Sequence, residues 1–167
     1  HADKLYTGWK KADDPFVKHP LVQHPALPKS EVLVVEQPVK TIHGQMVWHG
    51  PSTVGKDVDL TYAADLLGTA LDEPSSRFQK ALVDSGACTG ASISWYTQMN
   101  TGPITVSFDA AEDKTDACVK AVLAELPKLK EATYVTDDEM KAAAHTLEVA
   151  QIKEREKPSS FASVLTF

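Results

Sequence analysis

The sequence predicts an α+β fold in which an antiparallel sheet is packed on one face by helices. Three observations indicate this: short runs rich in β-branched residues, apolar residues repeated at helical spacing, and an order of two strands then two helices that occurs twice. A chain of 167 residues, 43% of them hydrophobic, is long enough for one ordinary domain with its own core. We therefore expect a two-layer sandwich of order β-β-α-α-β-β-α-α over residues 31–167.

The first thirty residues differ from the rest in their proline content. Proline biases the residue before it toward extended backbone, which disfavours helix. Four prolines fall in this stretch: Pro15, Pro20, Pro25 and Pro28. We expect residues 1–30 to form an extended strap or linker without helix.

The first half of the predicted domain opens with two strands. Residues 31–36 place β-branched and aliphatic residues between two glutamates, which is typical of a strand buried on both faces, and residues 43–49 form the second strand. Asp57 is placed to cap the helix that follows. One apolar stripe runs along that helix: Leu60, Ala63, Ala64, Leu67 and Leu71.

The second helix leads into a hairpin. Ser75 or Ser76 is placed to cap this helix, and Gly86 to end it in the left-handed conformation. Residues 92–98 and 104–108 are the next two strands, with a turn at residues 100–102. The later strand alternates apolar with hydroxyl side chains, which is typical of a half-buried strand.

Two helices close the predicted domain. The first covers residues 113–126, with its apolar side chains on one side. Thr136 and Glu139 have the spacing of a capping box, which opens a long helix that runs to Pro158. Residues 159–167 begin a new apolar segment.

Charge and hydropathy exclude two classes of partner. A formal net charge of −6 and a pI near 5.5 argue against nucleic acid or an anionic membrane as the main partner, because both contacts depend on clustered Lys and Arg. We expect no membrane span, since no apolar run approaches the roughly 20 residues that a spanning helix needs.

Two cysteines, Cys88 and Cys118, do not make a disulfide framework. We expect them to be small buried hydrophobic residues rather than a disulfide pair, although pairing stays open. The cysteines leave the compartment undetermined; our expectation is a soluble protein that is periplasmic in bacteria or secreted.

Several local phrases resemble the pitrilysin-type zinc peptidases, or inverzincins, the family of the processing peptidases and insulin-degrading enzyme. They are GPS at residues 50–52, SRFQKALV at residues 76–83, the acidic stretch before the third helix, and TDDEM at residues 136–140. Their order and spacing cover roughly residues 31–157. The resemblance implies the same strand and helix order, and it implies a domain that is truncated at its C-terminus here.

Such peptidases, the resemblance implies, have two similar halves that close around a peptide. One half holds zinc with an H-x-x-E-H motif and a more distant glutamate, and none of the six histidines of this chain lies in such a motif. The chain resembles the second half, which often carries a pattern like L-R-E-x-x-G-x-x-Y. Alignment puts Leu82 or Val83 in place of that Arg and Thr89 in place of that Tyr, so both are absent.

The candidate site residues are therefore peptide-facing rather than catalytic. We expect Arg77, Thr89 and Tyr96 to face a peptide, with residues 92–98, 104–108 and the loop of residues 86–90 bordering the chamber. Two alternatives stay open: Tyr96 packs in the core, or Arg77 is paired on a helix surface with Asp72, Glu73 or Asp84. His145 and Glu148 share a helix face but lack a third ligand, so we expect no metal in this chain.

The function that the resemblance implies is a non-catalytic, substrate-enclosing domain of a zinc metallopeptidase that acts on peptides. The alternative is a catalytically inactive peptidase-like subunit used for binding or scaffolding. In both cases the expected partner is a catalytic domain or subunit of the same family, which carries the zinc. Whether the full protein is an enzyme stays uncertain, and this chain alone should be inactive because it lacks H-x-x-E-H.

Overall fold

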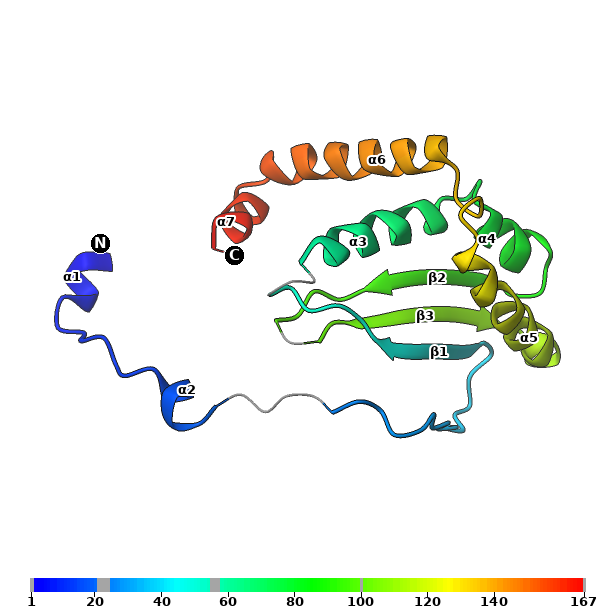
Figure 1. Cartoon of the computed structure of the whole chain (residues 1–167), viewed down its shortest axis with the longest axis horizontal. Helices are drawn as coiled ribbons and strands as arrows, with labels where there is room; N and C mark the ends of the chain where they lie inside the picture. The colour runs from blue at the N-terminus through cyan, green and yellow to red at the C-terminus, as the bar shows by residue number, and fades with distance from the viewer. Residues whose placement is uncertain (1, 21–24, 55–57, 100, 167) are drawn as a thin grey trace. The chain divides into compact units, whose positions relative to one another are not determined.

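The computed structural model describes residues 2–20, 25–54, 58–99 and 101–166. The chain forms two compact units, residues 1–31 and residues 32–167. The second unit contains a three-stranded antiparallel sheet with helices on one face (Figure 1). The predicted α+β class is confirmed.

The central strand of the sheet is the last of the three in the sequence. β3 (Pro103–Ala110) pairs with β1 (Ile42–His49) on one side and with β2 (Gly90–Trp95) on the other. In this register Asp109 lies opposite His43 in β1 and opposite Gly90 in β2. These strands match three of the predicted four, with bounds that differ by a few residues.

Residues 31–36 are not a strand in the structure. Their backbone belongs to no helix or strand, and their side chains are exposed rather than buried. The prediction of a strand covered on both faces was therefore wrong for this chain. A β-branched apolar run indicates a preference for burial in a sheet. Such burial also needs a neighbouring strand, and residues 31–36 pair with none in the structure.

The helices follow the predicted order. α3 (Val58–Asp72) is followed by α4 (Arg77–Gln79), which continues as the π-helix η2 (Lys80–Asp84). α5 (Thr115–Glu125) lies between two short 3₁₀ helices, η3 (Glu112–Lys114) and η4 (Leu126–Lys130). α6 (Asp137–Arg155) and α7 (Pro158–Thr166) complete the chain. Within the described ranges, no helix combines the length and apolar character needed to cross a bilayer.

Local capping accounts for where these helices begin and end. Ser76 accepts a hydrogen bond from the Gln79 N–H at 3.1 Å, and Thr136 and Glu139 make the predicted capping box. Gly86 has φ of 73°, a left-handed conformation that ends the second helix as predicted. The predicted cap Asp57 and the turn residue Asn100 lie outside the described residues.

The described residues of the first unit include two short helices, so the prediction of a stretch without helix was wrong. They are α1 (Ala2–Tyr6) and α2 (Pro15–Lys18). Pro15 is tolerated because it occupies the first turn of α2, where its missing N–H costs no hydrogen bond. Asp14 caps that turn by accepting from the Phe16 N–H at 2.9 Å.

The core lies between the sheet and the helices, and it contains a disulfide. Its buried members are Leu71, Phe78, Leu82, Cys88, Val106, Phe108, Ala110, Cys118, Val122 and Tyr134. Cys88 and Cys118 are buried as expected, but they are bonded to each other, which corrects the prediction that they do not pair. Their Cα atoms lie 4.9 Å apart, within the reach of a disulfide, and this proximity arises from tertiary packing between residues 30 positions apart.

A buried carboxylate joins α5 to the segment before α6. Glu125 accepts hydrogen bonds from the Tyr134 hydroxyl and from Lys128 Nζ, each at 2.6 Å. Burial alone would raise the pKa of Glu125, but these hydrogen bonds and the nearby positive charges of Lys128 and Arg77 lower it below its usual value. Burial and the bond to Glu125 raise the pKa of Tyr134, so its hydroxyl stays a donor.

We expect Tyr134→Phe to lower the free energy of unfolding by about 1.5 kcal/mol near pH 7, because Glu125 loses a charge-assisted hydrogen bond in a buried place. A lowered pKa in the folded state gives stability that is present above the usual pKa of 4.5 and is lost as pH falls. The difference between the two proteins should therefore shrink in acid, as measured by urea denaturation at several pH values.

Tyr62→Phe is the matched control, because Tyr62 is 69% exposed on α3 and its variant should unfold like the wild type. A difference for Tyr134→Phe that stays constant from neutral to acid pH would contradict the assigned role of the Glu125 carboxylate.

Candidate functional site

The face of the sheet that points away from the core is polar. Because side chains alternate along a strand, the buried Val106, Phe108 and Ala110 mark the covered face of β3, and their neighbours belong to the other face. The strand register then assembles one surface, the open face: His43, Gln45, Val47, Gly90, Ser92, Ser94, Thr105, Ser107 and Asp109. None of these residues is buried.

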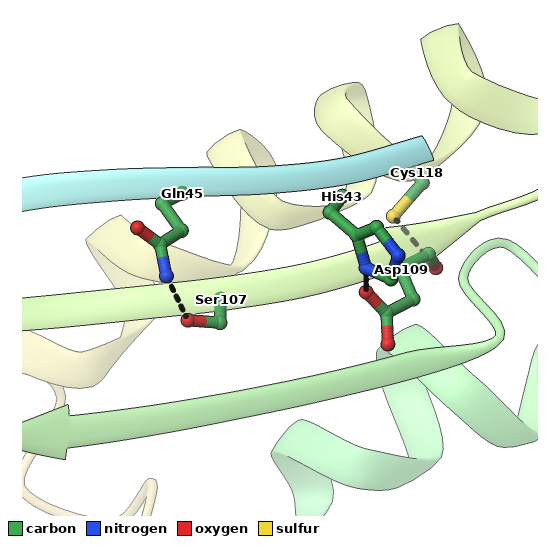
Figure 2. Close-up of polar contacts among 5 residues, drawn as sticks. All are labelled: His43, Gln45, Ser107, Asp109 and Cys118. Carbon is green, nitrogen blue, oxygen red and sulfur yellow. Dashed lines mark hydrogen bonds and ion pairs between the residues drawn. The ribbon is translucent and has the colours of Figure 1, made fainter. Parts of the chain in front are cut away.

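Two cross-strand contacts order this open face (Figure 2). His43 Nδ1 and Asp109 Oδ1 lie 2.6 Å apart, and Gln45 Nε2 donates to Ser107 Oγ at 3.4 Å. In the neutral tautomer that carries its proton on Nδ1, His43 donates to the carboxylate and its Nε2 is left as an acceptor. The arrangement offers hydrogen-bond acceptors and small hydroxyls to a ligand that lies on the sheet.

The backbone of Asp109 is held by the segment before β2 and lies beside the disulfide. Its backbone carbonyl accepts a hydrogen bond from the Thr89 N–H at 2.8 Å. The sulfur of Cys118 lies 4.0 Å from the same oxygen (Figure 2), as a contact rather than a donor because the disulfide has no S–H. The disulfide and the loop before β2 thus hold the backbone that presents the His43 partner.

The outer edge of β2 is occupied by side chains from the helical layer. Gln79 Nε2 donates to the Ala91 carbonyl at 2.9 Å, and Asp72 Oδ1 accepts from the Ile93 N–H at 2.9 Å. Burial raises the pKa of the Asp72 carboxyl, and the hydrogen bond from Ile93 opposes that rise. Gly68 brings α3 close to the same edge, because a Cβ there would lie 3.3 Å from the Ile93 carbonyl oxygen. An added strand would have to displace these contacts.

The structure does not bring the three predicted peptide-facing residues together. Arg77 lies in the helical layer, where its guanidinium is 4.7 Å from the centre of the Tyr134 ring and donates to the Thr133 carbonyl at 3.4 Å. The ion pairs of the described residues do not include one between Arg77 and Asp72, Glu73 or Asp84, the alternative that the sequence left open. Thr89 precedes β2 and Tyr96 follows it, so their seven-residue spacing separates them by about 23 Å at about 3.3 Å per residue.

Sequence reasoning missed His43 and Asp109 as a pair. They are 66 residues apart, and only the register of β1 against β3 places them opposite each other. The available signal was the polar alternation of residues 104–108, which continues to Asp109. It indicates which side chains share a face but names no partner on another strand.

The described residues do not fit a zinc site. His145 Nδ1 and Glu148 Oε2 are 3.8 Å apart on an exposed face of α6, and no third ligand joins them from the residues that the structure describes. More generally, the described part of the chain holds no group of three or more His, Cys, Asp or Glu residues placed to bind a metal ion. Zinc needs at least three protein ligands, so we assign no metal chemistry to these residues.

Comparisons with known proteins identify a matching family and two solved structures with a similar fold. The sequence profile described as the M16 peptidase inactive domain matches residues 2–147. A protease from Helicobacter pylori has a similar structure, with a TM-score of 0.79 and 22% identity over 98% of this chain and 40% of that protease. The inactive peptidase domain of a candidate zinc protease from Bordetella parapertussis gives a TM-score of 0.63 and 20% identity over 81% of this chain and 71% of that domain. A comparison with curated proteins gives no match. The chain thus spans less than half of the length of the Helicobacter protease.

Proposed function

This chain belongs to the M16 peptidase family as its inactive domain, and from that premise we propose that it is the non-catalytic, substrate-enclosing part of a zinc metallopeptidase that acts on peptides. Its partner would be a catalytic domain or subunit of the same family, which would hold the zinc. The observation that supports the proposal best is the open face, an accessible polar surface on an antiparallel sheet.

The chemistry of the open face suits a peptide of varied sequence. Small hydroxyl residues such as Ser92, Ser94 and Ser107 leave room for the ligand, and they can donate or accept hydrogen bonds with main-chain amides. His43 adds an acceptor with a fixed ring orientation, because Asp109 holds its other nitrogen. In this proposal Tyr96, which is 67% exposed beyond the end of β2, contributes an aromatic contact at the border of the chamber.

We expect His43→Ala to weaken the binding of an unstructured peptide by about 3–10-fold in the complex of this chain with its catalytic partner, through the loss of one or two hydrogen bonds. The measurement is the KM and the dissociation constant of a fluorescent peptide. His145→Ala is a closely matched control: it also removes an exposed histidine beside a carboxylate, but on α6.

Equal effects of the two substitutions would contradict a role for the open face. A complex that binds peptide through His43 but contains no zinc would favour the alternative function, an inactive binding or scaffolding subunit.

The disulfide supports a proposal for the compartment. Structural disulfides form and persist in oxidising environments, and they are rare in the reducing cytosol. Cys88 and Cys118 are both buried and bonded in this domain. We therefore propose that the protein matures in the bacterial periplasm or after secretion.

A further inference from the structure

An apolar run precedes β1, and the described part of the chain leaves its side chains exposed. The apolar run is residues 32–35, whose side chains are 90%, 87%, 79% and 66% exposed in chain order. Its backbone lies outside the helices and strands of the structure. Contiguous exposed apolar side chains of this kind mark sites of interaction.

The pattern of the run indicates what kind of partner it fits. In extended backbone, Val32 and Val34 point to one side, and Leu33 and Val35 point to the other. A segment that docks on a flat surface needs one apolar side, whereas this run is apolar on both. Such a segment fits a strand that is added to a sheet and covered on both faces.

Charges at the two ends of the run disfavour a second copy as the partner. Glu31 and Glu36 flank the run, and Lys29 Nζ lies 3.5 Å from the Glu31 carboxylate. Two copies paired antiparallel would place Glu31 opposite Glu36, and two copies paired parallel would place each glutamate opposite itself. Like charges directly opposite each other are destabilising. Glu31 and Glu36 therefore favour a partner strand with neutral or basic residues opposite them.

The sheet of the same domain does not take up the run either. The β2 edge is already occupied by Gln79 and Asp72. Between the run and β1 the backbone folds on itself, with the Val39 N–H bonded to the Gln37 carbonyl at 2.8 Å. The β1 edge is open, but residues 32–35 form no strand beside it in the structure.

We propose that the apolar run is a strand donated to an open sheet edge of the partner peptidase domain, at a place where basic side chains flank that edge. The partner is the one named in the proposed function, on which this inference rests, and it lies on the same polypeptide or on a separate subunit. A large partner is expected on length: the Helicobacter protease is matched over 98% of this chain, yet the match covers 40% of that protease.

Amide hydrogen exchange tests the pairing directly. In the isolated chain, the amides of residues 32–35 should exchange as fast as those of an unfolded peptide, because no ladder protects them. In the complex with the partner domain, alternate amides of the run should become protected by about 100-fold or more, as in a paired strand.

Each other result overturns the proposal. Protection in the isolated monomer would place the run on its own sheet, and protection that increases with protein concentration would identify a second copy. Unprotected amides in the complex would show that the run is not a donated strand.

Substitutions test the requirement for two apolar faces. Leu33→Lys and Val34→Lys put a charge on opposite sides of the run, and each should weaken the affinity for the partner domain by about 10-fold or more. Val39→Lys is the control, because Val39 is also exposed (55%) but lies outside the run. If Val39→Lys has the same effect, or if one face tolerates lysine, the strand assignment is wrong.

These measurements use no peptide substrate, so they can fail independently of the open face. If the amides of the apolar run are protected but His43→Ala leaves peptide binding unchanged, the donated strand is supported and substrate enclosure by the open face is rejected. If the amides stay unprotected but His43→Ala weakens peptide binding, the donated strand is rejected and the role of the open face is supported.

Discussion

Replacing Cys88 and Cys118 together by alanine is expected to lower the free energy of unfolding by about 3–4 kcal/mol, as the chain-entropy account gives for a loop of this length. The bond closes a loop between residues 30 positions apart, so its loss gives the unfolded chain more conformations. Denaturant titration at equilibrium measures this change directly. For a chain of this size the melting temperature should fall by about 10 °C.

Reduction supplies the control for this prediction. Both sulfur-bearing residues are buried, at 3% and 0% exposure, so a mild reductant should act slowly on the folded protein and rapidly once it is unfolded. Wild-type protein that is reduced while unfolded and then refolded should match the double alanine variant. Equal stability of the oxidised and reduced wild type would contradict a structural role for the bond.

Gly44→Ala is expected to cost about 2–3 kcal/mol, because the new methyl group would overlap the ring of Phe108. Gly44 and Phe108 lie opposite each other on β1 and β3, and the ring is buried against the core. It cannot move aside without disturbing its neighbours. Urea denaturation at neutral pH provides the measurement.

A double-mutant cycle identifies the cause. In a Phe108→Leu background, the cost of Gly44→Ala should fall below about 1 kcal/mol, since the atoms that it meets are gone. Gly8→Ala, where a Cβ would meet no atom within 4 Å, should change nothing. Full additivity of the two substitutions would show that ring overlap is not the reason for the glycine.

Features that depend on neighbours in sequence could be predicted for this chain. Ser76, Gly86 and the Thr136–Glu139 box act within one turn of helix, so residue type and spacing suffice to find them. The class of the fold followed in the same way from the order of strands and helices. It was confirmed although one predicted strand is absent from the structure.

Features that depend on tertiary contacts could not be predicted. The Cys88–Cys118 bond needs the loop before β2 to meet α5, and two cysteines alone do not reveal that meeting. Residues 31–36 are the opposite case. Their composition indicates burial, but their side chains are exposed in the structure. The His43–Asp109 pair likewise depends on strand register, which no local pattern encodes.

The occupied edge of β2 limits how this domain can assemble. Strands polymerise into open-ended fibres when both edges of each sheet accept a neighbour. Here Gln79 and Asp72 hold backbone groups of Ala91 and Ile93, so growth by strand addition is left to the β1 side. Direct pairing between the sheets of two copies can therefore use only their β1 edges, and such edge-to-edge pairing ends at two sheets.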